Sequence, residues 1–252
     1  MPLTLPTHPV VAVLLKRSRP GRFDGVALTI GAIAPDLAFA AGGYGVTIHS
    51  HAWHAPLWWA LPLTLLLTRL VRWTAPTVAA HLPGAGPLAL RDYGVLGAAR
   101  HRWQVTTMSA LVGAASHIGW DAFTHPTVDG GGVLFPALHQ QVWRGMPWWD
   151  LLSTASDLFG LVAAAALAVH IGRSRLLRRW YGPPPSIVRR PVRFWSTVAL
   201  FSTLGLALLP VQPVRLPADQ AVRVLLIAVV AFLAGAAAAR TRTVAAQPQP
   251  RA

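Results

Sequence analysis

Apolar residues dominate six long stretches of the chain, and short polar loops separate them. The stretches are residues 25–42, 55–73, 104–124, 151–171, 194–209 and 221–239. A helix needs about 20 mostly apolar residues to cross the hydrocarbon core of a bilayer. The pattern therefore predicts an all-α fold, a polytopic transmembrane helix bundle of about six spans. The stretch 25–42 fits least well, because Pro35 and Asp36 interrupt it.

A shorter apolar segment from His8 to Leu15 precedes these spans. It is too short to cross a bilayer, and we interpret it as a half-helix or a re-entrant segment. The chain then divides into three parts. Residues 1–172 form a membrane domain that carries the candidate site. Residues 173–240 form a two-span extension that begins with an arginine-rich loop, and residues 241–252 form a disordered tail.

The composition supports a membrane protein. Hydrophobic residues make up 54% of the chain and charged residues only 12%, whereas about 25% of residues are charged in a typical soluble domain. The absence of cysteine excludes disulfides and thiolate metal sites. Glutamate is also absent, so any carboxylate chemistry falls to the eight aspartates.

The basic residues indicate the orientation of the spans. The net charge of +14 comes from 21 arginines and a single lysine, Lys16. They gather in alternate loops, at 16–22, 69–102, 173–193 and 240–242. Because basic loops stay in the cytoplasm, we predict an integral membrane protein with both termini cytoplasmic. We interpret the charge as contact with anionic lipids at the cytoplasmic face rather than with nucleic acid.

The stretch 116–126 carries the most unusual polar residues. His117, Asp121 and His125 lie four residues apart within it. On a helix, residues i and i+4 share a face, so two imidazoles and a carboxylate point the same way. The residue before a proline disfavours the helical conformation, so Pro126 predicts that the helix ends near His125. Three such groups inside a membrane are costly, which points to a function for them.

Other polar residues are predicted at the same depth as this row. Asp36 lies about 18 Å from the inner end of its span, and His117 about 20 Å from the inner end of its own, at 1.5 Å per residue. His51 lies in the outer loop that follows Asp36. Six tryptophans near the outer span ends fit an interfacial belt: Trp53, Trp58, Trp59, Trp143, Trp148 and Trp149.

Each of these polar residues also has a structural explanation, and these explanations stay open. Asp36 fits the cap of a broken helix. His117 and Asp121 fit a hydrogen-bonded pair that holds helices together, and His125 fits stabilisation of a helix C-terminus. Two weaker candidates lie on the same side, Asp157 and His139.

Taken together, these residues favour a metal site. Imidazole and carboxylate ligands without thiolates suit a divalent cation, with zinc as the default for a hydrolytic site. The cation would also compensate the buried carboxylates. Together with the family resemblance given below, which implies hydrolysis of a phosphoester, the leading hypothesis is a metal-dependent hydrolase acting near the extracytoplasmic face, on a phosphoester of a lipid or another envelope metabolite. Two alternatives stay open: a transporter or proton relay that uses the same row, and a non-catalytic membrane scaffold.

The order of four short motifs resembles an uncharacterised bacterial integral-membrane family, a domain of unknown function. The motifs are Thr7-His8-Pro9, Ala34-Pro35-Asp36, Ser50-His51 and Ser116-His117-x-x-x-Asp121-x-x-Thr124-His125. Leu61-Pro62-Leu63 follows His51 by ten residues, as in that family, which selects His51 over His49 and His54. The resemblance covers about residues 1–170 and implies a location in the bacterial cytoplasmic membrane.

The same skeleton is similar to membrane-bound metal-dependent hydrolases of the bacterial inner membrane. More distantly, it is similar to the zinc-dependent phospholipase C and P1 nuclease group. This resemblance implies five metal ligands: His8, Asp36, His51, His117 and Asp121. It implies a catalytic role for Asp121 and for His125, the latter as a further ligand or a proton donor.

This chain departs from the secreted enzymes of that group. It lacks their later His and Glu ligands in recognisable form, so a mononuclear or dinuclear site is expected. His8 also lies only eight residues before Lys16, which the charge pattern places in the cytoplasm. The N-terminus must therefore dip well into the membrane for His8 to reach the other ligands.

Overall fold

The computed structural model describes residues 7–126 and 135–240, and it is mostly helical. The long helices are α3 (Leu61–His81), α4 (Trp103–Thr124), α6 (Trp148–Arg173), α8 (Pro191–Leu208) and α9 (Pro217–Ala239). The short helices are α1 (His8–Ser18), α2 (Gly25–Gly31), α7 (Leu176–Tyr181), the π-helix η2 (Pro56–Ala60) and the 3-10 helices η1 (Asp36–Ala41), η3 (Leu90–Gly97), η4 (Pro136–His139) and η5 (Leu209–Val211). Two short antiparallel strands, β1 (Gln141–Trp143) and β2 (Met146–Pro147), complete the fold.

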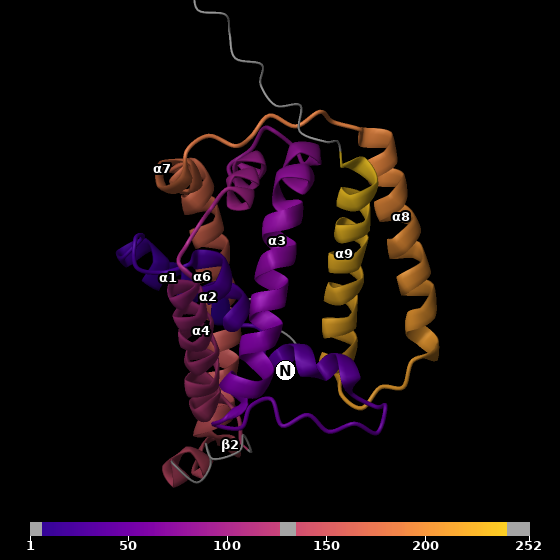
Figure 1. The fold of residues 1–252 in the computed structure, drawn as a ribbon. Coiled ribbons are helices and arrows are strands. Elements are labelled where there is room, and N and C mark those ends of the chain that lie inside the picture. The colour runs from indigo at the N-terminus through magenta and orange to yellow at the C-terminus, as the bar shows by residue number, and fades with distance from the viewer. Residues whose placement is uncertain (1–6, 127–134, 241–252) are drawn as a thin grey trace, which may run out of the picture.

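The helices form a bundle in which α3 lies between two groups (Figure 1). On one side of α3 lie α1, α2, α4 and α6, and on the other side lie α9 and then α8. Helix α7 lies at one end of the bundle and the β1–β2 hairpin at the other. The α8–α9 pair contacts the N-terminal half through α3 and through the segment η1, both of which pack against α9.

Five of the six predicted stretches are helices, and 104–124 coincides with α4 to within one residue. Three of the described helices are long and apolar enough to cross a membrane: α6, α8 together with η5, and α9. The chain thus has the character of a membrane protein. Six spans stay a prediction, because arginines in α3 and the polar row in α4 reduce the apolar character of these two helices. The predicted tail, 241–252, lies outside the described residues.

The prediction of one continuous helix over residues 25–42 is wrong. Helix α2 ends at Gly31, and the chain continues through turns to Pro35 before η1 begins at Asp36. A proline lacks the backbone N–H and clashes with the preceding turn, so it breaks an α-helix. The break leaves Asp36 at the first residue of a new short helix, buried inside the bundle. The short helix predicted from His8 is confirmed as α1, which continues to Ser18.

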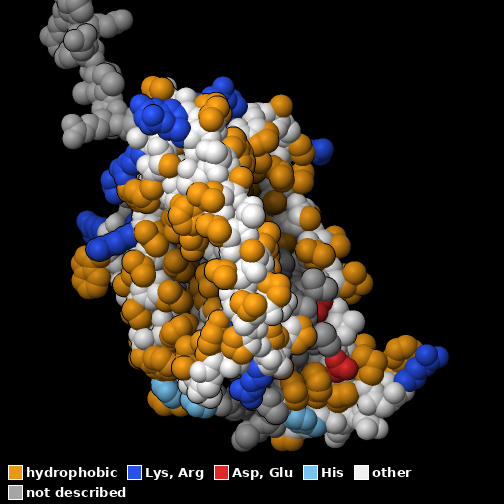
Figure 2. Space-filling view, turned by 90° about the vertical axis from the view of Figure 1, so that its right-hand side faces the viewer, with side chains coloured by type: hydrophobic (Ala, Val, Ile, Leu, Met, Phe, Trp, Pro, Cys, Tyr) orange, Lys and Arg blue, Asp and Glu red, His pale blue; other side chains and the backbone are white. Residues whose placement is uncertain are grey.

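Apolar side chains cover the surface of the bundle along α8 (Figure 2). Val192, Leu200 and Leu208, for example, expose 80%, 56% and 57% of their surface. Lys and Arg side chains are most numerous in the upper part of this view, and histidines with fewer Lys and Arg side chains lie at its lower end. Such an apolar belt between two polar ends suits the hydrocarbon of a bilayer and its two faces.

Helix α9 is joined to the N-terminal half by one buried arginine. Arg223, which is 5% exposed, donates hydrogen bonds to the carbonyl oxygens of Ala40 (3.1 Å), Pro213 (2.7 Å) and Gly42. Ala40 belongs to η1, the helix that begins at Asp36. The C-terminal helix pair therefore supports the segment that carries a candidate site residue.

Candidate metal centre

Four of the predicted site residues converge at one point inside the bundle. Asp36 comes from the start of η1, His51 from the loop before η2, and His117 and Asp121 from adjacent turns of α4. One ligand atom from each lies within 4.8 Å of every other, so the group could hold a metal ion. Asp36, His117 and Asp121 are buried, whereas the His51 side chain is 18% exposed and forms an open edge of the site.

The distances between these atoms match the edges of a coordination polyhedron. The Nε2 atom of His51 lies 3.1 Å from Nε2 of His117 and 3.3 Å from both Asp36 Oδ1 and Asp121 Oδ2. His117 Nε2 lies 3.1 Å from Asp121 Oδ2 and 3.5 Å from Asp36 Oδ1. Two ligands placed about 2.1 Å from a tetrahedral ion lie about 3.4 Å apart. The four residues therefore fit a small divalent cation.

Close packing of α2 against α4 positions His117. A Cβ added to Gly113 would lie 2.2 Å from the carbonyl oxygen of Leu28, and one added to Gly31 would lie 2.4 Å from that of Ala110. Only glycine permits this approach. As a result, Nδ1 of His117 lies 2.8 Å from the carbonyl oxygen of Ala32, just beyond the end of α2.

Two further hydrogen bonds hold the other ligand-bearing segments. Nε1 of Trp59 donates to the carbonyl oxygen of Ala34 at 2.9 Å, next to Pro35 and Asp36. The hydroxyl of Ser50, which is buried, lies 3.1 Å from Nδ1 of His51. A contact at Nδ1 thus orients the imidazole ring of His117 and that of His51, and in both residues Nε2 faces the centre. Such partners around a ligand fix its orientation and its tautomer.

The acceptor atoms of the centre face each other and are stabilised only when a positive charge lies between them. A neutral His117 that donates its Nδ1 proton to Ala32 has a bare Nε2, and this lone pair faces two carboxylates. Acceptor atoms at 3.1–3.5 Å repel each other unless a proton or a cation lies between them. Burial lowers the pKa of His51, but its hydrogen bonds to Asp121 and Asp36 outweigh burial and raise the pKa above its usual value.

His8 lies beside the four residues, although its topological position argued against this. Its ring centroid is 3.8 Å from that of His117, and its Nε2 is 3.5 Å from Oδ1 of Asp121. His8 is 4% exposed, yet within residues 7–126 and 135–240 no hydrogen-bond partner is found for its Nδ1 and Nε2 or for Oδ1 of Asp121. Buried polar atoms without partners are rare and costly, so this side of Asp121 also suits a cation or a bound polar ligand.

The remaining predicted residues lie at different distances from the centre. His125 follows the last residue of α4, as Pro126 predicts, and its Nδ1 lies 3.5 Å from Asp121 Oδ1 and 3.1 Å from the Thr124 hydroxyl. Asp157 in α6 interacts electrostatically with His125. His139 is exposed on η4. Of these three residues, His125 is the one whose side chain lies directly beside a residue of the centre, Asp121.

The sequence interpretation missed the residues that support the ligands. Trp59 was assigned to an interfacial belt, but its indole binds the Ala34 carbonyl. Arg72 was counted as a loop charge, but it pairs with the fully buried Asp24, which also accepts from the Thr106 hydroxyl at 2.8 Å. The only sequence signal for these contacts is a polar residue at an apolar position, and it does not identify the partner.

Comparison with known proteins gives a family but no characterised relative. No curated protein and no solved structure matches the chain. One family model does match, and the matched residues include α8 and α9 as well as the residues of the centre. A family model described as "Domain of unknown function (DUF4184)" matches residues 1–245, and the chain belongs to this family.

Proposed function

We propose that the protein is a membrane-bound, metal-dependent hydrolase. The observation that carries this proposal is the convergence of Asp36, His51, His117 and Asp121, with Nε2 of His117 directed at two carboxylates. Hydrogen-bonded pairs that only hold helices together would not require four side chains with acceptor atoms, from three segments of the chain, to meet at one point. The order of these residues along the chain also fits the resemblance to metal-dependent hydrolases.

These four residues would hold the ion, with His8 as a further ligand on the Oδ1 side of Asp121. Two imidazoles and two carboxylates suit zinc best, and manganese or iron next. When bound, such an ion supplies Lewis acidity toward a phosphoryl oxygen and makes water a better nucleophile near neutral pH. Without the ion, the carboxylates of Asp36 and Asp121 would repel each other in a buried site.

The protein's own residues would orient the substrate and move the proton. His125 is 27% exposed at its side chain, more open than the other ligands, and its Nδ1 contacts both Thr124 and Asp121. It is the residue best placed to protonate a leaving group, because a buried ligand cannot exchange its proton with solvent. Asp121 would position both His117 and His125, since its two oxygens face different sides.

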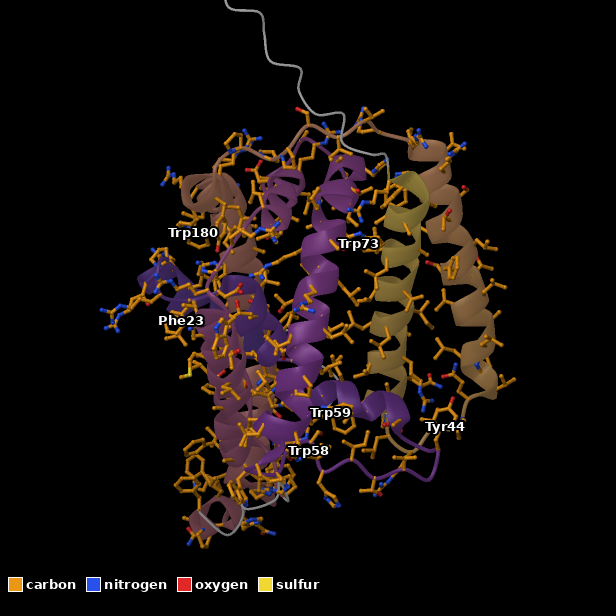
Figure 3. The ribbon with its side chains drawn as sticks, in the orientation of Figure 1. Phe23, Tyr44, Trp58, Trp59, Trp73 and Trp180 are labelled. Carbon is orange, nitrogen blue, oxygen red and sulfur yellow. The ribbon has the colours of Figure 1, made fainter. Side chains whose placement is uncertain are left out.

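The location of the centre favours a lipid or envelope substrate. His117 lies 15 residues after Arg102, about 22 Å along α4 at 1.5 Å per residue. If the basic ends are cytoplasmic, the centre opens toward the extracytoplasmic face. Trp53 and Trp58, which are 82% and 48% exposed, lie on the loop and on the helix η2 that follow His51, and Figure 3 shows Trp58 beside Trp59 at this end of α3. Aromatic residues of this kind settle at headgroup depth, where a lipid phosphoester lies.

Metal content is the direct test. We expect full-length protein purified in detergent without chelators to contain at least one equivalent of zinc, manganese or iron by elemental analysis. The double variant His117→Ala, Asp121→Ala should contain less than a tenth of this amount. His170→Ala, an exposed histidine at the far end of α6, is the matched control and should retain the metal. Equal and negligible metal in all three proteins would end the proposal.

A transport or proton-relay function has one specific observation in its favour. The buried pair of Asp24 and Arg72, with the Thr106 hydroxyl, lies between the centre and the basic end of the bundle, on α2, α3 and α4. Polar groups within a membrane protein often mark an ion path. Proton or metal flux into proteoliposomes that persists after metal chelation, and that Asp24→Asn abolishes, would favour this function over hydrolysis.

A further inference from the structure

A second site lies away from the metal centre, in a cavity of about 330 Å³. Its walls come from α1, α2, α3, η3, α6 and α7 and are almost wholly apolar, with Val13, Val26, Val71, Ile171 and Trp180 among them. Cavities that bind small molecules begin at about this size. Figure 3 shows Trp180 and Phe23 on this side of the bundle, far from Trp58 and Trp59. We call it the Lys16 cavity, after its one lysine.

Lys16 is the single lysine of the chain and is 4% exposed. Its ammonium group donates to the carbonyl oxygens of Pro20 (2.5 Å) and Phe23 (2.7 Å), and it lies 5.1 Å from the ring centroid of Tyr181. An ammonium group has three donors, so one remains after these two bonds. Among the described residues, Lys16 forms no ion pair, which leaves its full charge without a counter-ion beside an apolar cavity.

The neighbouring charges do not neutralise Lys16. The carboxylate of Asp24 is fully buried and already accepts from Arg72, from the Thr106 hydroxyl and from two backbone N–H groups at the start of α2. Arg72 and Lys16 thus bring two positive charges against one negative charge. Two carbonyl oxygens and the rings of Trp180 and Tyr181 stabilise the ammonium group of Lys16, but among the described residues no carboxylate pairs with it. Burial accordingly lowers the pKa of Lys16, to about 8.

The surroundings favour an anion over any other partner. Arg17, Arg19 and Arg22 are exposed directly after Lys16, and clusters of basic residues beside a bilayer attract anionic lipids. Tyr181 also lines the cavity, and burial raises its pKa to about 12, so its hydroxyl, which lies 3.3 Å from Nε2 of His101, remains protonated. An anion at Lys16 would therefore meet the ammonium group, while the cavity beyond it accepts only apolar groups.

We propose that the Lys16 cavity binds one acyl chain of an anionic phospholipid, with the lipid phosphate at the Lys16 ammonium group. The charge of the phosphate compensates the lysine, and the chain fills the apolar volume between α2, α3 and α7. The site is separate from the metal centre and stands whether or not the protein is a hydrolase. The phospholipid comes from the bilayer in which the helices lie, so no soluble carrier is required.

Native mass spectrometry of the delipidated full-length protein tests the proposal. The protein is incubated with phosphatidylglycerol, phosphatidylcholine or free oleate, and the retained adducts are counted. We expect one phosphatidylglycerol per chain, retained at least about tenfold over phosphatidylcholine, a difference of about 1.4 kcal/mol. Lys16→Met should reduce this preference to near unity, Lys16→Arg should preserve it, and Arg144→Met, an exposed charge of the β1–β2 turn at the other end of the bundle, should leave it unchanged.

A second variant keeps the lysine and removes the space. Val13→Phe places a larger side chain against the cavity, and we expect it to reduce retention of phosphatidylglycerol while the protein elutes and melts as the wild type does. If Lys16→Met does not fold, this variant carries the test. Equal retention of the two phospholipids by the wild type, or full retention by Val13→Phe, would overturn the proposal. Retention of oleate in place of phosphatidylglycerol would overturn the assignment to a phospholipid.

Discussion

The imidazole of His117 donates from Nδ1 to the carbonyl oxygen of Ala32, at 2.8 Å, and so faces the metal centre with Nε2. The donor lies on α4 and the acceptor just after α2, so this single bond depends on how closely the two helices approach. That approach is set by glycines at the contact. Helix packing and ligand geometry are therefore linked, and the first prediction follows from this link.

Gly113→Ala should reduce both stability and metal binding. The new Cβ would lie 2.2 Å from the Leu28 carbonyl oxygen, so α2 and α4 must separate and the bond from His117 must lengthen. Overpacking of this kind costs about 1–3 kcal/mol. Thermal unfolding in detergent and elemental analysis measure the two effects. Gly119→Ala, where the added Cβ meets nothing within 4 Å, should keep the metal and gain up to about 1 kcal/mol.

Removal of the metal should lower the melting temperature of the wild type. An ion that binds only the folded protein stabilises it by about 2.7 kcal/mol at a hundredfold excess over its Kd, or about 5–10 °C for a chain of this size. We expect EDTA to cause this shift in the wild type and to have little effect on Asp36→Asn. A variant that shows the same EDTA shift as the wild type would exclude Asp36 as a ligand.

Arg223→Met should weaken the metal centre from the opposite side of the bundle. The change removes the charged donor from the carbonyl oxygens of Ala40, Gly42 and Pro213, and the loss of these hydrogen bonds costs about 2 kcal/mol or more. Because η1 also carries Asp36, metal affinity should fall several-fold in an isothermal titration. Arg215→Ala removes an exposed arginine nearby and serves as the control. Unchanged affinity in Arg223→Met would mean that α9 does not support the centre.

Asp24→Asn should be among the most destabilising single changes. It leaves the buried guanidinium of Arg72 unpaired, and breaking a buried pair by removal of one partner costs about 3–5 kcal/mol. The double variant Asp24→Asn, Arg72→Met removes both charges and should be less destabilised than the sum of the single variants. Chemical unfolding measures all three. Additive losses would show that the two side chains do not act as a pair.

The stability of the lipid-free protein should rise between about pH 8 and pH 10.5. Burial lowers the pKa of Lys16 from 10.5 to about 8. In this window the unfolded chain therefore binds a proton that the folded protein does not, and stability increases with pH. Melting curves should show this rise in the wild type and a smaller one in Lys16→Met. Phosphatidylglycerol should reduce the rise, because its phosphate stabilises the charged lysine.

The sequence predicts the local elements well and the contacts between them less well. Pro126 and the i, i+4 spacing of His117 and Asp121 predict both the end of α4 and the shared face of the two ligands. Periodicity and apolar length predict the other long helices. The break at Pro35 was visible as a weakness, yet a length criterion still read 25–42 as one helix. The positions of these helices can be predicted from short sequence patterns because a helix depends on interactions between residues a few positions apart.

The contacts that support the centre join residues far apart in the chain. Asp24 and Arg72 are separated by 48 residues, and Arg223 is separated from Gly42 by 181. No pattern within a single segment encodes such a pairing. His8 shows the same limit, since its distance from Asp121 depends on how α1 tilts against α4 and α6 rather than on its depth in a span. Which polar residues are unusual was therefore easier to predict than the geometry in which they meet.

Helix α1 has one end in each of the two sites. His8, at its first residue, lies against His117 and Asp121, and Lys16, two turns later and about 12 Å away, lies in the apolar cavity. A helix of 11 residues moves as one body, so a lipid that displaces Lys16 also displaces His8. We expect the composition of the bilayer to set the metal affinity, and bound metal to change the lipid affinity by the same factor. Binding at either site would then change the binding affinity of the other through a single short helix.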